Sequence, residues 1–375
     1  MSFITDYSEI LALIDKADPP EYARSRNYLD GAVTRLSPYI SRGVISTKQV
    51  LQRTLERGYE PGRMEKFTQE LAWRDHWQQN WIAKGTAINK DLKHEQFPVE
   101  NKEIASHLVD ANLGIEAIDA AVKELYETGY MHNHVRMYTA AIACNMAYSH
   151  WWMPARWMYY HLLDADWASN ALSWQWVAGS NANKKYVANQ GNVNKYCHTN
   201  DHGTFMDVDY SAFEFPTNDH PEWKAHHFKT PEKLKDTVSL ELVTKLPESQ
   251  PIILDSKLPS YIYNWYNLDP KWDEETVANR ILLLEPSVFK EYPISDKSVQ
   301  FMLDLSKNIA GIQVFVGEFS DLISEHSLTD IHFKEHPLNT AYKGTEHSRD
   351  WMFSVSGYHS SFFGFWKKAK KQFRY

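Results

Sequence analysis

The spacing of apolar residues changes once along the chain, near residue 200. From about residue 5 to 200, apolar residues recur at steps of three and four, which is typical of amphipathic helices. A clear example is the run Ile115, Ile118, Ala121, Val122 and Leu125. Gly129 follows it, and glycine suits the left-handed conformation that ends many helices. We therefore expect one helix over 115–129 and a second over 132–148.

Two earlier helices carry start signals. Ser46 followed by Gln49 is the pattern of a capping box and predicts a helix that runs through Leu55. Ser37 followed by Pro38 predicts an N-cap with proline at the first helical position.

Beyond residue 250 the apolar runs become short. Runs at 252–254, 281–284, 314–316 and 331–333 predict strands, and the pattern of residues 297–308 predicts a helix between the second and third of these. Strands that alternate with helices indicate a small parallel sheet. The predicted fold class is therefore α + α/β, with a helical domain at 1–200, a linker at 201–250 and an α/β domain at 251–375.

Composition narrows the chemistry. The net charge is −8, but residues 1–200 carry 21 Lys and Arg against 22 Asp and Glu, so most of the excess acid lies in the second half. Two cysteines are too few for a disulfide framework or an iron–sulfur cluster, and the histidines are scattered, so we expect no metal site and an organic cofactor for any redox chemistry. No apolar stretch is long enough to cross a membrane, which predicts a cytoplasmic protein. We further expect a monomer.

Polar clusters interrupt the helical half. Residues 34–37 place hydroxyl groups ahead of a helix N-terminus, where a phosphate is favoured. Glu70, Trp73 and Arg74 lie within one turn, which fits either a ligand site or an intrahelical ion pair beside a core tryptophan. Two carboxylates, Asp164 and Asp166, stand in apolar sequence and need partners such as Arg136 or ligand hydroxyls.

In their order along the chain these clusters resemble the DNA photolyase and cryptochrome family. The matching stretches are TRLSPYI (34–40), ELAWR (70–74), GYMHNHVRM (129–137), DADWASN (164–170) and WQW (174–176). The resemblance implies an all-helical FAD-binding domain and FAD as the cofactor. The residues that it implies around FAD are Tyr22, Thr34, Arg35, Leu36, Ser37, Arg136, Asp164, Asp166 and Asn170.

The resemblance also implies catalytic and substrate residues. Trp174 and Trp151 match the two flavin-proximal members of a tryptophan electron relay, and Asn170 would face flavin N5. The cavity for a DNA lesion would be lined by Glu70, Trp73, Arg74, Asn133, Met137 and Trp176, with Trp73 stacked on the lesion.

Two departures from the family pattern change the expectations. Phe97 stands near the position of the outermost relay tryptophan, and phenylalanine is a poor electron donor. Family members begin with an antenna domain, whereas this chain enters the helical pattern almost at once, and we expect the antenna domain at a different position. Residues 251–375 resemble a diverged antenna domain at the C-terminus, through RILLLEP (280–286), TDIHFKEH (329–336) and SFFGFWKK (361–368). Whether an antenna chromophore binds is left open.

The resemblance predicts a photolyase that splits pyrimidine dimers in UV-damaged DNA by light-driven electron transfer from reduced FAD. Cyclobutane dimers are favoured over (6-4) products, because (6-4) enzymes carry histidines where Asn133 and Met137 stand. The alternatives are a cryptochrome-like photoreceptor without repair activity and a flavoprotein without a light function. Asn170 favours repair, since photoreceptors often carry Asp or Cys there.

Overall fold

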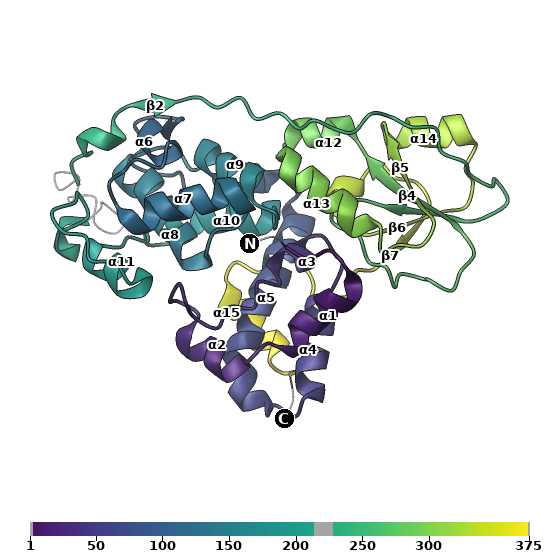
Figure 1. Ribbon diagram of the computed structural model, residues 1–375, viewed down its shortest axis with the longest axis horizontal. Helices are drawn as coiled ribbons and strands as arrows, with labels where there is room; N and C mark the ends of the chain where they lie inside the picture. The colour runs from purple at the N-terminus through teal and green to yellow at the C-terminus, as the bar shows by residue number, and fades with distance from the viewer. Residues whose placement is uncertain (1–2, 214–227, 374–375) are drawn as a thin grey trace.

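Helices dominate the first 200 residues, as the periodicity predicts. The computed structural model describes residues 3–213 and 228–373. Its first helices are α1 (Tyr7–Asp15), α2 (Pro19–Ser25), α3 (Ser37–Ser41), α4 (Thr47–Glu56) and α5 (Pro61–Lys84). Six more follow, namely α6 (Ser106–Val109), α7 (Glu116–Thr128), α8 (Asn133–Ala141), α9 (Trp152–His161), α10 (Trp167–Ala178) and α11 (Gln190–Cys197). The long helix α5 packs against α2 and α4 of the first group and against α10 of the second (Figure 1).

The capping signals have mixed outcomes. The hydroxyl of Ser46 accepts the backbone N–H of Gln49, so Ser46 is the N-cap of α4, but the side-chain amide of Gln49 donates to the hydroxyl of Tyr7 and does not complete the capping box. Helix α7 ends at Gly129 with a left-handed φ of 74°, as predicted. The Ser37 N-cap is wrong. Leu36 already has helical backbone angles, which puts Ser37 inside the first turn of α3 with Pro38 second.

Five parallel strands form one sheet in the order β5-β4-β3-β6-β7. They are β3 (Ser260–Tyr263), β4 (Asn279–Leu284), β5 (Ile312–Val316), β6 (Ile331–Lys334) and β7 (Thr345–His347). The first strand in the sequence lies in the centre, and later strands add to either side, as in doubly wound folds. All residues of β3 and β4 are buried. The predicted parallel sheet is confirmed.

Individual strand predictions differ in outcome. The runs at 281–284, 314–316 and 331–333 fall inside β4, β5 and β6. The strand predicted at 252–254 is wrong: Ile253 is 86% exposed, and its backbone N–H and C=O bond the side-chain amide of Gln313 instead of a neighbouring strand.

Helices cover both faces of the sheet. They are α12 (Pro286–Glu291), α13 (Asp296–Ser306), which matches the helix predicted at 297–308, and α14 (Phe319–His326). On one face, Phe319 and Leu322 of α14 pack with Ile281 of β4. On the other face, α13 joins the same buried apolar cluster as the helical part. Helix α13 therefore packs between the sheet and the N-terminal helices (Figure 1).

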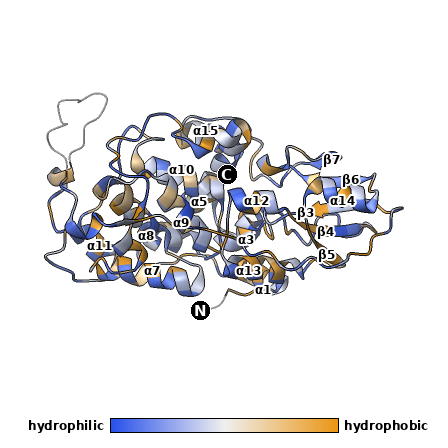
Figure 2. Cartoon of the chain, turned by 90° about the horizontal axis from the view of Figure 1, so that it is seen from above, coloured by the Kyte–Doolittle hydropathy of each residue, from blue (hydrophilic) through white to orange (hydrophobic). Residues whose placement is uncertain are grey.

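The C-terminal segment leaves the sheet. The last helix, α15 (Phe362–Ala369), packs with Leu51 of α4 and with Met64 and Ala72 of α5. Figure 2 shows α15 on the side of α5 and α10. The motif at 361–368 therefore lies against the helical part. The predicted division of the chain into domains at residues 200 and 250 stays a prediction.

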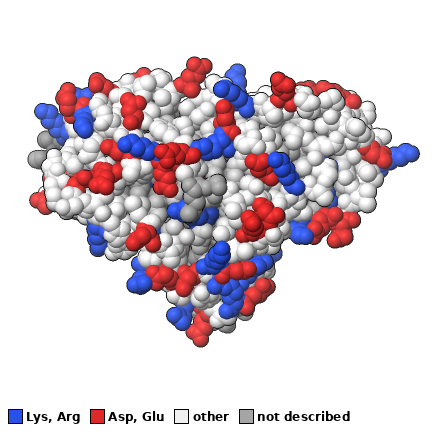
Figure 3. Space-filling view, viewed as in Figure 1, with Lys and Arg blue, Asp and Glu red and all other residues white. Residues whose placement is uncertain are grey.

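Short elements complete the described chain. They are the 3₁₀ turns 85–89, 210–213, 232–234 and 337–339, the π-helical turn 142–146, and a two-stranded ladder of β1 (Ile104–Ala105) with β2 (Thr237–Val238). In the described residues, 3–213 and 228–373, no helix has the length and apolar character needed to cross a bilayer. Acidic and basic side chains are interspersed over the face shown in Figure 3.

Candidate functional site

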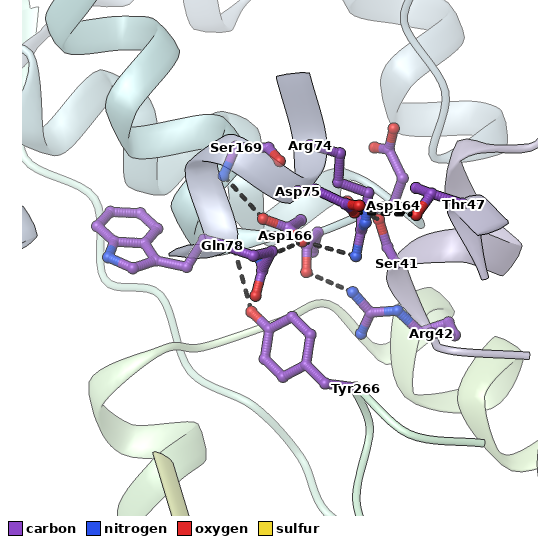
Figure 4. Close-up of polar contacts among 12 residues, drawn as sticks. Ser41, Arg42, Thr47, Arg74, Asp75, Gln78, Asp164, Asp166, Ser169 and Tyr266 are labelled. Atoms are coloured by element: carbon purple, nitrogen blue, oxygen red, sulfur yellow. Dashed lines mark hydrogen bonds and ion pairs between the residues drawn. The ribbon is translucent and has the colours of Figure 1, made fainter. Parts of the chain in front are cut away.

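The N-terminus of α10 gathers buried polar side chains from several helices. Asp166 is the N-cap of α10, and its carboxylate accepts the backbone N–H of Ser169 at 2.7 Å. An aspartate is favoured there because it meets an otherwise unpaired N–H and the positive end of the helix dipole. The same carboxylate pairs with Arg74 at 2.8 Å and accepts from Nε2 of Gln78 at 2.7 Å, both on α5 (Figure 4).

A second buried ion pair lies two residues earlier. Nη1 of Arg136, on α8, is 3.1 Å from Oδ2 of Asp164, and its Nε donates to the carbonyl of Met131 at 2.8 Å. The other carboxylate oxygen of Asp164, Oδ1, is buried and has no hydrogen-bond partner among the described residues. Buried polar atoms are normally paired, so Oδ1 is suited to a donor from a bound molecule.

Two residues at the end of α3, Ser41 and Arg42, bond the segment that carries the two aspartates. The hydroxyl of Ser41 donates to the carbonyl of Asp164 at 3.1 Å and accepts from Nη1 of Arg74 at 2.8 Å. Nη2 of Arg42 donates to the carbonyl of Ala165, and its guanidinium lies over the ring of Trp265 at 4.1 Å. Burial lowers the pKa of Arg42. Backbone and side-chain contacts thus fix the segment that carries both carboxylates.

The three residues predicted to be catalytic lie on α10 and at the start of α9. The amide nitrogen of Asn170 donates to the carbonyl of Ala155 at 2.8 Å, which orients the amide. Trp174 and Trp151 are buried in the same apolar cluster. The indole N–H of Trp151 donates to a carboxylate oxygen of Asp91 at 2.6 Å.

The remaining predicted cofactor residues lie on α2 and at or just before the start of α3. Tyr22 packs edge to face on Phe67 of α5, and burial raises the pKa of its hydroxyl. The hydroxyl of Thr34 accepts the N–H of Leu36, and Leu36 is buried. Arg35 has a left-handed φ of 53° and lies over the ring of Tyr130 at 4.8 Å. Ser37 is the first residue of α3.

The predicted substrate residues are more dispersed. Glu70 pairs with Lys66 of its own helix at 2.7 Å. One face of the Trp73 ring is stacked on Phe362 of α15, with centroids 4.0 Å apart and an interplanar angle of 9°. Asn133 is exposed at the start of α8, Met137 is half-buried, and Trp176 is 37% exposed. The direct contacts of the site therefore join Arg74 and Arg136 to the two aspartates.

Several residues of the site were missed from the sequence. Gln78 could have been found, because it lies four residues after Arg74 on the same face of α5. Ser41 and Arg42, each 1% exposed, were polar residues in an apolar stretch. Tyr266 had no local signal; its hydroxyl accepts the N–H of Trp167 at 3.2 Å from a loop 99 residues away in sequence.

A cavity of about 110 Å³ lies where α3, α4 and α5 meet the carboxyl edge of the sheet. Gln78 lines it from α5, and its side-chain oxygen accepts from Nη1 of Arg349 at 2.7 Å. His336, which follows β6, stacks on Tyr266 at 4.4 Å in the same wall. The sheet thus meets the helices through paired polar groups.

Residues 67–207 match the family model described as the FAD binding domain of DNA photolyase. The match includes α8, α10 and the part of α5 from Phe67 onward, and thus all four residues of the two ion pairs. Residues 67–207 are therefore similar to the FAD-binding domain of DNA photolyases. Both predictions, of the family resemblance and of FAD as the cofactor, are confirmed.

Curated relatives give matches of a similar length. The chain is 35% identical over 152 residues to a deoxyribodipyrimidine photo-lyase of Streptomyces griseus, covering 40% of this chain and 32% of that protein. It is 33% identical over 171 residues to a protein of the same name from Thermus thermophilus, covering 44% and 40%. The matched region therefore spans less than half the length of these relatives.

Solved structures give a similar extent. A cryptochrome of Synechocystis sp. PCC6803 superposes with a TM-score of 0.47 at 24% identity, over 52% of this chain and 44% of that one. An archaeal photolyase of Sulfolobus tokodaii with two FAD molecules gives a TM-score of 0.45 at 25% identity, over 52% and 44%.

The residues of the FAD-binding domain fit the chemistry of FAD. The unpartnered Oδ1 of Asp164 is a buried acceptor, and FAD offers hydroxyl and amine donors. The buried hydroxyl of Ser169, in the first turn of α10, also has no partner among the described residues. The buried oxygen of Asp164 and the buried hydroxyl of Ser169 are thus suited to a ligand of this chemistry, and the assignment of the predicted residues to FAD stays a prediction.

Proposed function

We propose that the protein is a DNA photolyase that splits UV-induced pyrimidine dimers, with cyclobutane dimers favoured over (6-4) products. The observation that carries the proposal is the pair of buried ion pairs, Arg74 with Asp166 and Arg136 with Asp164, inside the region that matches the photolyase FAD-binding domain. We further propose that it acts as a monomer in the cytoplasm on damaged DNA.

Bound FAD would supply the light-driven electron for the reaction. The chain's own residues bind and orient the participants. The proposed flavin contacts are those predicted from the resemblance, with Asp164 offering its free oxygen and Asn170 its fixed amide. Trp174 and Trp151 are the proposed electron relay, and both are shielded from water.

The substrate residues stay proposals of the same kind. Trp73 is half-buried, and Phe362 covers one of its two ring faces, so the other face is the one proposed to stack on a flipped base. Glu70 is 29% exposed beside it and is the proposed hydrogen-bond partner of a base edge. Asn133, Met137 and Trp176 complete the proposed lesion cavity.

The test is a repair assay on the purified, flavin-loaded protein. Oligonucleotides that carry one defined cyclobutane dimer or one (6-4) product are incubated with the reduced protein under blue light and in the dark. Light-dependent loss of the cyclobutane dimer is expected. Repair of the (6-4) product alone would contradict the lesion preference. Flavin binding with a light response but no repair of either lesion would reject the photolyase proposal and favour a photoreceptor.

A further inference from the structure

The indole of Trp151 is held against a carboxylate. Its Nε1 donates to Oδ1 of Asp91 at 2.6 Å, and its backbone N–H donates to Oε1 of Gln96 at 2.9 Å. Gln96 in turn donates its own backbone N–H to Oδ2 of Asp91 at 2.8 Å. Trp151 is fully buried, and the Asp91 side chain is 18% exposed. The carboxylate therefore lies between the buried ring and solvent.

We propose that Asp91 accepts the indole proton when Trp151 loses an electron, so that the relay ends at Trp151 as a neutral radical. This inference rests on the proposed function, in which Trp151 passes electrons toward Trp174. A buried indole N–H needs a hydrogen-bond partner in any case. A carboxylate differs from other partners because it can also take the proton, at a distance within the 2.6 to 3.2 Å range for proton transfer.

The proposed step transfers one electron and one proton from Trp151. Light-excited oxidised flavin is the oxidant, and the electron vacancy that it creates reaches Trp174. One electron passes from Trp151 to Trp174, the Nε1–H bond of Trp151 breaks, and an O–H bond forms on Asp91. Trp151 ends as a neutral radical and Asp91 as a neutral acid. A thiol reductant in solution later returns one electron to Trp151, and the proton returns from Asp91.

Asp91 is prepared to accept a proton because it is ionised. Burial raises the pKa of the carboxyl, but the hydrogen bonds from His150, from the N–H of Gln96 and from Trp151 outweigh it and hold the pKa below its usual value. His150 lies 3.5 Å from Oδ1 on the solvent side. Among the Lys, Arg and His side chains of the described parts of the chain, only His150 forms an ion pair with Asp91, and the buried thiol of Cys144 also interacts electrostatically with this carboxylate.

The neighbouring rings are poorer ends for the relay. Phe97, near the position of the family's outermost tryptophan, is 51% exposed and hard to oxidise. Trp152 packs edge to face on Trp151 at 5.6 Å, but the Arg156 guanidinium 5.3 Å from its ring opposes a positive charge there. Trp167 is 6.5 Å from Trp151 and donates its N–H to the neutral amide of Asn89.

The test is flash photolysis of flavin-loaded protein with oxidised FAD, in which the neutral and protonated tryptophan radicals are distinguished by their visible spectra. Wild type is expected to form the neutral radical, more slowly in D₂O than in H₂O. Asp91→Asn keeps an acceptor for the indole N–H but cannot take the proton. It should lose the neutral-radical signal and return to oxidised flavin severalfold faster. Asp91→Glu should restore part of the signal, and thermal melting checks that both variants fold.

Trp152→Phe is the matched control and should leave the neutral radical unchanged. An unchanged neutral radical in Asp91→Asn would overturn the inference while leaving the relay intact, and so would its loss in Trp152→Phe. Absence of any tryptophan radical in flavin-loaded wild type would overturn both the inference and the proposed relay. Lesion repair by chemically reduced protein is measured in parallel, because it depends on the proposed photolyase function and not on Asp91.

Discussion

The helical site and the carboxyl edge of the sheet both bury charged groups, and among the described residues both leave hydrogen-bond donors without a partner, but of the two only the helical site also leaves a carboxylate oxygen unpaired. At the helical site the unpartnered atoms are Oδ1 of Asp164, the hydroxyl of Ser169, and Nε and Nη1 of Arg42. At the sheet edge the unpartnered atoms are donors on Arg349, at Nε and Nη2, and a ring nitrogen of His336. Burial, with Arg349 nearby, lowers the pKa of His336, so its ring is neutral. The helical site therefore offers a ligand both a carboxylate acceptor and unpaired donors.

The space at the sheet edge is small. The cavity at the sheet edge measures about 110 Å³. Sites for drug-sized ligands and cofactors are usually about 300–1,000 Å³. Residues of the chain itself, Arg349 and Trp351 among them, line this junction. The sheet edge therefore joins the two parts through contacts between the chain's own residues, such as Arg349 with Gln78, whereas the helical site leaves a buried carboxylate oxygen without a partner.

The largest expected effect comes from Asp164→Ala. The change leaves Arg136 without its partner, and loss of one member of a buried pair costs on the order of 3 kcal/mol in the free energy of unfolding. Because it also removes the free acceptor, FAD should no longer be retained. Flavin absorbance after gel filtration and chemical denaturation measure the two effects.

Asp164→Asn is the control for that variant, since it keeps an acceptor oxygen and the shape of the side chain. It should retain more FAD than the alanine variant. A full complement of flavin in Asp164→Ala would reject the assignment of Asp164 to the cofactor.

The next largest effect is a pH dependence of stability that is caused by Asp75, where α5 contacts the C-terminal segment. Asp75 on α5 accepts from the backbone N–H of Met352 and the hydroxyl of Thr47, yet burial raises its pKa to about 6. The folded state therefore binds more protons than the unfolded state between about pH 4 and pH 6, and stability falls as pH rises through this window, by roughly 2–3 kcal/mol in total.

Asp75→Asn should remove the contribution of this carboxyl to the pH dependence. Between pH 4 and 7 the free energy of unfolding of the variant should then change only through the other titratable groups. The measurement is the free energy of unfolding in urea at several pH values. A wild-type stability that rises from pH 4 to pH 6 while the variant follows the same curve would contradict the role of Asp75.

A smaller effect is expected for Trp73→Ala. Stacking of a base on an aromatic ring contributes roughly 1–3 kcal/mol, so binding of lesion-bearing DNA should weaken about 5- to 150-fold. Flavin content should stay near that of wild type, because the cofactor contacts lie on other residues. Fluorescence titration with lesion-bearing and intact oligonucleotides gives the affinities.

Phe362→Leu serves as the control for packing, since it loosens the stacked neighbour of Trp73 but leaves the indole in place. If Trp73 is only a core residue, both variants should lower stability and disturb flavin and DNA binding together. Wild-type lesion affinity in a folded, flavin-loaded Trp73→Ala protein would remove Trp73 from the proposed substrate site.

The smallest expected change concerns a second chromophore. Because the cavity at the sheet edge is small, we expect purified protein to show the spectrum of FAD alone and no energy transfer from another pigment. The measurement is the action spectrum of flavin reduction, that is, the rate of photoreduction as a function of the wavelength of illumination. A second near-ultraviolet or blue absorber that drives flavin reduction efficiently would contradict the comparison between the two regions.

The helical site was largely predictable from the sequence because its signals are local. Charged residues stand in apolar helices at Arg74, Arg136, Asp164 and Asp166, and such residues need partners. The resemblance further predicted which side chains line a cofactor site, and that assignment stays a prediction. The sequence alone could not show that Arg74 contacts Asp166 rather than Asp164, because that choice depends on how α5 lies against α10.

The sheet part was predictable only in outline. The apolar runs in β4, β5 and β6 indicated strands, but the central strand β3 begins with Ser260 and contains two tyrosines, so its apolar signal is weak. The run at 252–254 has the composition of a strand, but its backbone bonds a side-chain amide. The position of α15 on α5 depends on contacts between residues about 290 apart, such as Trp73 with Phe362, which no local pattern records.

The most direct test of the account is the amount of FAD that the protein binds. The expected result is one FAD per chain, either on purification or after reconstitution, measured by flavin absorbance against protein concentration. Protein that folds, as judged by cooperative thermal melting, yet carries no flavin and takes up none would contradict the assignment of the buried carboxylates of α10 to a cofactor.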